Sequence, residues 1–186
     1  MIASKMNRKV LVPLATLAAA GAVAVGSGAT FTSTTENTTS AVTSGRLTHT
    51  NSKSNAAVFT IPNMKPGDVV NGKLTITNTG TLPATFTLRE PTSTNAFGAP
   101  AAAGSANYLH LKITDDTANT TVYNGDFGGL GDNELKDLGQ FDAGVAHAFT
   151  FTVSLDAATP NSEQAKTAGA TYQWVSTQLS GTTTEQ

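Results

Sequence analysis

Three histidines and no cysteine limit the chemistry that this chain can carry out. His49, His110 and His147 lie 61 and 37 residues apart, so no two of them have the spacing of a zinc-binding His-Glu-x-x-His helix. The absence of cysteine excludes a cysteine nucleophile, a zinc finger and a disulfide scaffold, and no Gly-x-Ser-x-Gly elbow marks a serine hydrolase. His49 and His110 stand at positions that predict the polar face of a strand. We therefore expect surface histidines, no catalytic residue and a protein that is not an enzyme.

Acidic residues between positions 124 and 134 offer a second set of possible ligands. Asp126, Asp132 and Glu134 lie in a glycine-rich stretch, and calcium takes about six to eight oxygens, some of which such carboxylates supply. The stretch does not follow the EF-hand pattern, and a solvated acidic loop is the alternative. No predicted helix follows these glycines, so they do not make a phosphate cradle. The sequence leaves a calcium site open at this loop and predicts no other cofactor.

Tyr172 and Trp174 are aromatic residues for which two interpretations compete. Exposed rings of this kind stack on sugars, which would indicate a carbohydrate-binding face. The two residues stand two positions apart, and this period places both side chains on the same face of a strand. We expect that face to be the core.

Composition and charge favour a β-rich protein and exclude a nucleic-acid binder. Thr occurs 32 times in 186 residues, and charged residues make up only 13%. Three of the 11 basic residues, Lys5, Arg8 and Lys9, stand at the N-terminus, so the rest of the chain carries eight basic and 13 acidic residues, a net charge of −5. A protein that binds nucleic acid needs a basic surface, which this composition does not provide.

Residues 1–29 predict an export signal. Basic residues precede an apolar stretch at positions 10–25, and Ser27 and Ala29 have the small side chains of a cleavage site. A permanent membrane anchor is the alternative, but the stretch has 16 residues and includes Pro13, whereas a spanning helix needs about 20. We expect cleavage after Ala29, a secreted product in the extracellular matrix or at the cell surface, and no stable membrane insertion afterwards.

Three segments follow the predicted signal peptide. Residues 30–44 form a Thr-rich arm whose few apolar members include Phe31 and Val42. Such a segment buries too little apolar area to fold alone, but its Thr content makes it competent to form a strand at a sheet edge. Residues 45–179 predict the folded domain, and residues 180–186 a polar tail.

Short alternating runs, broken by Gly, Pro, Asn and Asp, predict eight or nine strands in the folded domain. The clearest run is 145–155, in which Phe149, Phe151, Val153 and Leu155 alternate with Thr and Ser residues. The other runs are 46–50, 56–61, 69–77, 82–89, 108–114, 120–123, 134–138 and 170–179. Residues 63–68 predict a tight turn, 91–106 and 124–133 predict loops, and 161–167 predicts a short helix. One buried face per strand indicates an all-β antiparallel sandwich of two sheets, of the jelly-roll type, with a barrel as the alternative.

Three stretches carry a family resemblance. The first begins Gly28-Ala29-Thr30-Phe31-Thr32, an A-x-F mature start, and runs to Ser44-Gly45-Arg46-Leu47, an S-G-x-L opening strand. The second is FTIPNMKPGDVVNGKLTITN at residues 59–78, which continues to Gly80 and contains Lys-Pro-Gly-Asp. The third is the closing Tyr172-Gln173-Trp174. Together they resemble the TasA/camelysin family of secreted bacterial proteins.

The resemblance implies a structural protein of extracellular biofilm-matrix fibres. It implies a jelly-roll sandwich that is exported through the general pathway and processed by a dedicated type of signal peptidase. In such fibres the N-terminal segment of one subunit adds as a strand to the sheet of the next, by donor-strand complementation. By position, residues 30–42 would be the donor arm of this chain, with Phe31 and Val42 as anchors, and the partner would be another copy in a filament.

Two other functions stay open. A monomeric adhesion or carbohydrate-binding module would be favoured by aromatic rings exposed on one sheet face or by calcium dependence. Camelysin-like members are also described as metallopeptidases, which stoichiometric zinc and converging histidines would support. A long exposed edge strand beside a groove would favour the fibre subunit over both alternatives.

Overall fold

The computed structural model describes residues 42–98, 107–131 and 134–185. The predicted signal peptide and residues 30–41 of the predicted arm lie outside this part of the chain. The described residues form one 3₁₀ turn, η1 (Asn161–Glu163), within the predicted short helix, and eight strands: β1 (His49–Asn51), β2 (Val69–Asn78), β3 (Ala84–Asn95), β4 (Leu109–Asp115), β5 (Thr120–Asp126), β6 (Lys136–Phe141), β7 (Ala146–Leu155) and β8 (Ala168–Gln178).

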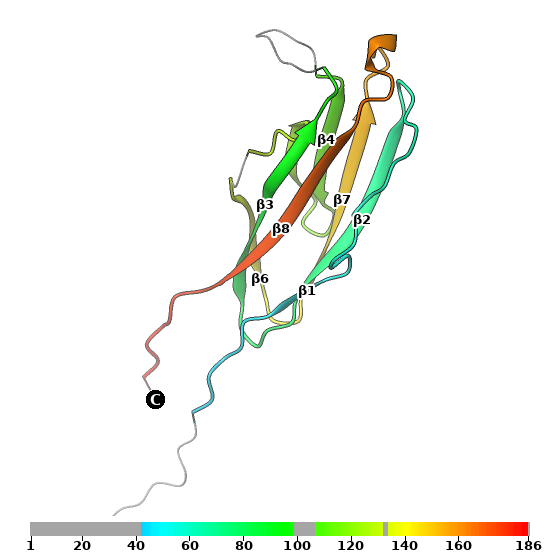
Figure 1. Cartoon of the computed structure of the whole chain (residues 1–186). Coiled ribbons are helices and arrows are strands. Elements are labelled where there is room, and N and C mark those ends of the chain that lie inside the picture. The colour runs from blue at the N-terminus through cyan, green and yellow to red at the C-terminus, as the bar shows by residue number, and fades with distance from the viewer. Residues whose placement is uncertain (1–41, 99–106, 132–133, 186) are drawn as a thin grey trace, which may run out of the picture. The chain divides into compact units, whose positions relative to one another are not determined.

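The strands form two antiparallel sheets (Figure 1). The five-stranded sheet has the order β1-β2-β7-β4-β5, and the three-stranded sheet has the order β6-β3-β8. Strands distant in the sequence are neighbours, since β2 pairs with β7 and β3 pairs with β8. The all-β, two-sheet sandwich that the alternating pattern predicted is confirmed.

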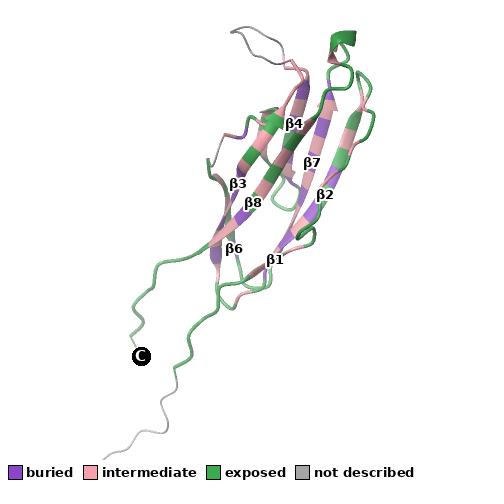
Figure 2. Ribbon diagram, viewed as in Figure 1, coloured by how far each residue is buried: buried purple, intermediate pink, exposed green. Residues whose placement is uncertain are grey.

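Alternation along each strand decides which side chains enter the core. In β7, Phe149 and Phe151 are fully buried and Val153 and Leu155 nearly so, whereas the intervening Thr and Ser residues are half-buried. Figure 2 shows this repeat as bands along β7. Because successive side chains of a strand point to opposite faces, the sequence period of two becomes one apolar face and one polar face. β7 therefore supplies the centre of the core between the two sheets.

A column of aromatic rings joins strands from both sheets. His49 of β1 meets Phe86 of β3 edge-on, with ring centroids 5.6 Å apart. Phe86 stacks on Phe141 of β6 at 4.3 Å, and Phe141 stacks on His147 of β7 at 3.7 Å. The column links β1 and β7 of one sheet through β3 and β6 of the other, so it holds the two sheets in register.

β3 extends further than predicted. Residues 91–95 were expected in a loop but continue β3, and their partners lie in β8. The pairing of β3 with β8 shifts between Arg89 and Thr92, which marks a β-bulge at Glu90 and Pro91. A bulge accommodates a proline because the extra residue has no ladder hydrogen bond to lose. The proline was the reason to predict a loop, and the bulge explains why that prediction is wrong.

The predicted strand at residues 56–61 is not formed. These residues follow β1 and belong to no described strand, although Val58, Phe59 and Ile61 pack partly buried against the core. An alternating sequence indicates that one face of a segment is apolar. A strand also needs the edge of a neighbouring strand with which to form hydrogen bonds. In this structure the segment makes the apolar contacts without the pairing.

Replacing Asn78 by Ala should destabilise the fold by about 2 kcal/mol. Asn78 is fully buried at the end of β2, and its side-chain amide donates to the backbone oxygens of Leu82 and Phe141, both at 2.9 Å. The substitution leaves these carbonyls without that donor. Urea unfolding of Asn78→Ala measures the loss, with Asn71→Ala on the exposed face of the same strand as the control. Equal free energies of unfolding for the two variants would contradict this role.

Candidate interaction site

β8 presents one open edge. It pairs with β3 on one side, and it is the last strand of its sheet among the described residues. Its sequence, AGATYQWVSTQ, has 11 residues and contains neither a charged residue nor a proline. Natural sheet edges are usually protected by charges, proline, bulges or short length, because their unpaired N–H and C=O groups attract other strands. β8 has none of these protections along its outer edge.

The other outer strands of the described sandwich are better protected. β1 has only three residues. β5 has seven residues, ends at Asp126 and pairs irregularly with β4. β6 has six residues, starts with Lys136 and Asp137, and has an irregular register with β3. β8 is therefore the outer strand best suited to accept another strand.

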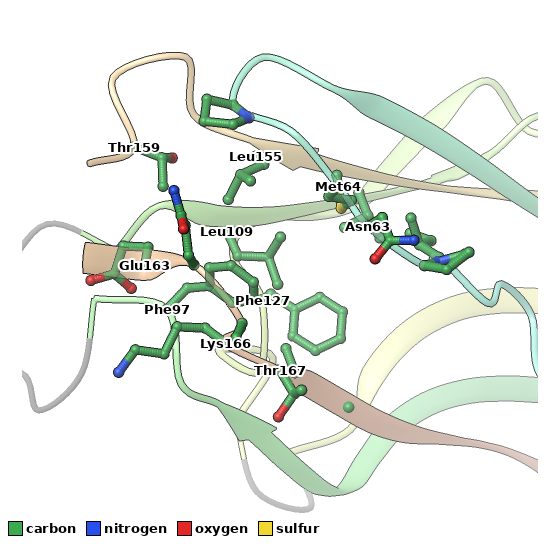
Figure 3. Close-up of a pocket in the computed structure, with 18 of the residues that line it drawn as sticks. Asn63, Met64, Phe97, Leu109, Phe127, Leu155, Thr159, Glu163, Lys166 and Thr167 are labelled. Carbon is green, nitrogen blue, oxygen red and sulfur yellow. The ribbon is translucent and has the colours of Figure 1, made fainter. Parts of the chain in front are cut away.

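A cavity of about 670 Å³ lies at the start of β8 (Figure 3). Its floor includes Leu109, Val153 and Leu155 from the five-stranded sheet and the ring of Phe127. Glu163, Lys166 and Thr167 line it on the side of η1 and β8. The cavity thus has an apolar floor and a polar rim, which suits an apolar side chain carried on a polar backbone.

A second cavity of about 610 Å³ continues along β8. It lies between residues 53–59, which follow β1, and residues 170–174 of β8, and His49 also lines it. Phe59 and Ala170 line both cavities, so the two cavities adjoin along β8 and are treated as one feature. We call it the β8 groove, with residues 53–64 as one wall and residues 167–174 as the other.

Tyr172 and Trp174 face the core from β8, as predicted. Trp174 is buried, and Phe151 lies 4.9 Å from the ring of Tyr172 and 6.2 Å from that of Trp174, between ring centroids. Burial raises the pKa of Tyr172, and the nearby Glu90 raises it further, so the phenol stays protonated at neutral pH. These rings strengthen the attachment of β8 to the core, and they do not form an exposed sugar-stacking face.

The three histidines lie in three different environments. His110 lies on the outer face as predicted, with its Nδ1 3.3 Å from Asp126 Oδ1. The expectation of surface histidines is wrong for His147, which points inward, stacks on Phe141 and has a side chain that is only 13% exposed. Its Nδ1 lies 2.6 Å from Oδ2 of the buried Asp115. The interior position follows from the parity of β7, in which His147 shares the face of Phe149.

His49 connects β1 to the accepting strand. Its Nδ1 lies 2.9 Å from Ser176 Oγ of β8, and its ring is half-buried against Phe86 of the opposite sheet, so the predicted position on the polar face is wrong for His49. Burial lowers the pKa of His49 below 6.5, so the imidazole is neutral at pH 7. The contact ties the short strand that follows the arm to the far end of the β8 edge.

The residues predicted as calcium ligands are only partly described. Asp132 lies outside the described residues. Asp126 faces His110, and Glu134 Oε1 lies 2.8 Å from Lys136 Nζ. Among the residues that the structure describes, no group of three or more His, Cys, Asp or Glu side chains is arranged to hold a metal ion.

Of the predicted anchors, only Val42 is described. Val42 is 98% exposed, and Phe31 lies outside the described residues. The sequence did not reveal the wall at residues 53–64, because its pattern indicated an ordinary strand. The lack of charge and proline in residues 168–178 could have indicated an unprotected edge. The sequence could not show which strand would be the outermost one of its sheet.

Replacing His49 by Gln should remove part of the acid sensitivity of the fold. The pKa of His49 is lower in the folded than in the unfolded chain, so the unfolded state takes up the proton more readily. Its stabilising contribution is complete above about pH 6.5 and is lost as the pH falls toward the lower folded-state pKa. Urea titrations give the difference in free energy of unfolding between the parent and His49→Gln. This difference should therefore become smaller as the pH is lowered from 7.5 to 5. A difference that stays constant would contradict this, and His110→Gln is the control.

Comparison with known proteins supports the resemblance predicted from the sequence. The family model for camelysin metallo-endopeptidase matches residues 5–95, which include β1, the wall at residues 53–64, β2 and β3. A search of curated proteins gave no match. In the described part of the chain, no helix has the length and apolarity to cross a membrane. The predicted resemblance to the TasA/camelysin family is confirmed, since residues 5–95 of the chain match the camelysin model.

Proposed function

We propose that this chain is an exported structural protein, a subunit of extracellular or biofilm-matrix fibres. In this proposal residues 30–42 of one copy add as a strand to the outer edge of β8 in the next copy. The observation that carries the proposal is the long, uncharged edge of β8 beside the β8 groove. An added strand gives both partners main-chain hydrogen bonds, and the groove gives the incoming side chains an apolar surface to bury.

The proposed arm matches the edge in length and character. Its 13 residues span about 43 Å when extended, and the 11 residues of β8 span about 36 Å. The arm carries one charged side chain, Glu36, and β8 carries none, so no opposed like charges hinder pairing. Thr and Ser supply the small side chains and β propensity that suit a narrow groove.

The proposed contact is head-to-tail and therefore propagates. Each copy offers one arm and one open edge, and the two surfaces are different. A heterologous contact of this kind builds an open filament unless its rotation closes a ring. Export fits the same scheme, because a signal peptidase that removes residues 1–29 would leave Thr30 as a free N-terminus, so assembly would begin outside the cell.

The family name also indicates a metallo-endopeptidase, which is the alternative function. The described residues do not fit a metal centre. His49, His110 and His147 lie on three different strands, and each contacts a different partner: Ser176, Asp126 and Asp115. One equivalent of tightly bound zinc in the purified chain, lost in His147→Ala, would favour this alternative. No observation favours the carbohydrate-binding alternative, since Tyr172 and Trp174 face the core.

Deleting residues 30–42 from the chain that begins at Thr30 should abolish filaments and leave a folded monomer. The parent should form filaments in negative-stain electron micrographs, and the deletion variant should sediment as a monomer with unchanged circular dichroism. Adding the free 30–42 peptide to the parent should shorten the filaments, because the peptide occupies the acceptor edge. Filaments of equal length from both chains would refute the donor role of the arm.

Placing a charge at the acceptor edge should weaken assembly without unfolding the subunit. Thr171 is exposed on β8 and lines the second cavity. Thr171→Lys should raise the critical concentration for filament formation at least about tenfold, because edge lysines oppose strand addition. Thr120→Lys, at an exposed position of β5, is the matched control and should assemble like the parent. Equal critical concentrations for the two variants would exclude β8 as the acceptor.

A further inference from the structure

Residues 56–61 have the sequence of a strand but not its hydrogen bonds. The segment reads AAVFTI, and Phe59 and Ile61 are half-buried whereas Thr60 is exposed. Among the described residues, the backbone of 57–64 makes no hydrogen bond to another group. Ala56, Lys65 and Gly67 at its borders do make such bonds. Residues 57–64 of this wall are therefore a row of backbone donors and acceptors without partners in the part of the chain that the structure describes.

This wall packs against the side of the core formed by the five-stranded sheet. Phe59 packs toward the five-stranded sheet, with its ring centroid 6.5 Å from Phe151 and 6.2 Å from Phe127. The wall lies so close to β2 that a Cβ built on Gly72 would come within 2.6 Å of the Val58 carbonyl oxygen. The absence of a side chain at Gly72 allows this approach. On its other side the wall faces β8 across the groove.

A strand that enters the groove has two edges to satisfy. If it pairs with β8 alone, its other edge and the wall at residues 56–61 remain two unpaired backbones facing each other. Backbone N–H and C=O groups that lose water without finding a partner are costly. If the new strand pairs with β8 on one side and with residues 56–61 on the other, this cost is removed. Residues 56–61, whose sequence is that of a strand, then form one.

We infer that residues 56–61 are a second acceptor, which pairs as a strand with the far edge of the arm that adds to β8. The inference rests on the proposed strand addition, and the occupant is residues 30–42 of a second copy. Neither residues 56–61 nor β8 carries a charge, and the arm has only Glu36, so a neutral polar strand matches both walls. The inserted strand would then bridge the three-stranded sheet to a segment that already lies against β2.

Hydrogen exchange of the full chain beginning at Thr30, before and after assembly, tests the inference. In the monomer the amides of residues 57–61 should exchange fast, because they have no backbone partner. In filaments the same amides should slow at least about a hundredfold, together with outward-facing amides of residues 169–177. Mass spectrometry of peptides from the two regions, quenched at matched times, gives both readouts.

The outcomes separate this inference from the proposed function. Slowed exchange in residues 169–177 alone would overturn the second acceptor and leave strand addition at β8 standing. Filaments with no slowing in either region would overturn both. A monomer that stays monomeric at high concentration would also overturn both, and slowed exchange in residues 30–42 of that monomer would show that the arm folds back on its own subunit.

Proline substitutions give an independent test. Successive N–H groups of a strand point to opposite sides, so Ala57→Pro and Thr60→Pro remove donors from opposite edges of the segment. Both side chains are exposed, and neither amide donates a hydrogen bond in the described structure, so both variants should keep the parental urea midpoint. At least one should raise the critical concentration about tenfold, whereas Thr60→Ala should not. Parental assembly of both proline variants would contradict the second acceptor.

Discussion

The backbone groups along the outer edge of β8 are the feature on which the proposed assembly depends. A strand in the middle of a sheet satisfies its N–H and C=O groups on both sides, but within the described residues β8 pairs with β3 alone. Water satisfies the open edge of the monomer, and a second strand does so with the added burial of side chains. The length of β8 and its lack of charge leave this edge suited to pairing, while the other outer strands are short or irregular.

The rest of the sandwich holds that edge in place. Phe151 anchors Tyr172 and Trp174, which fix β8 to the core from the inner face. The bulge at Glu90 and Pro91 lets β3 pair along nearly the whole of β8. On the opposite wall of the groove, residues 53–64 fill the side of the core with half-buried apolar groups but do not pair with β8. A rigid core thus carries an edge that remains open.

The sequence predicted the features that depend on local pattern. The period of two in residues 146–155 placed Phe149 and Phe151 in the core, and the parity of Tyr172 and Trp174 placed both rings inward. The features it missed depend on what lies across the sheet. Residues 56–61 alternate like a strand yet pair with no strand among the described residues. Pro91 lies in a strand because a bulge accommodates it. His147 is interior because it shares the face of Phe149, while Asp115 reaches it from another strand.

Disulfide trapping between two variants measures strand addition most directly, because the native chain has no cysteine. One variant carries Thr171→Cys on β8, and its partner carries a single cysteine in the arm, at Thr32, Thr35 or Thr38. After the two are mixed, assembled and oxidised, at least one arm position should give a covalent heterodimer with Thr171→Cys. The same arm variants should give none with Thr120→Cys on β5. Equal trapping at both strands, or coupling only between arms, would contradict strand addition at β8.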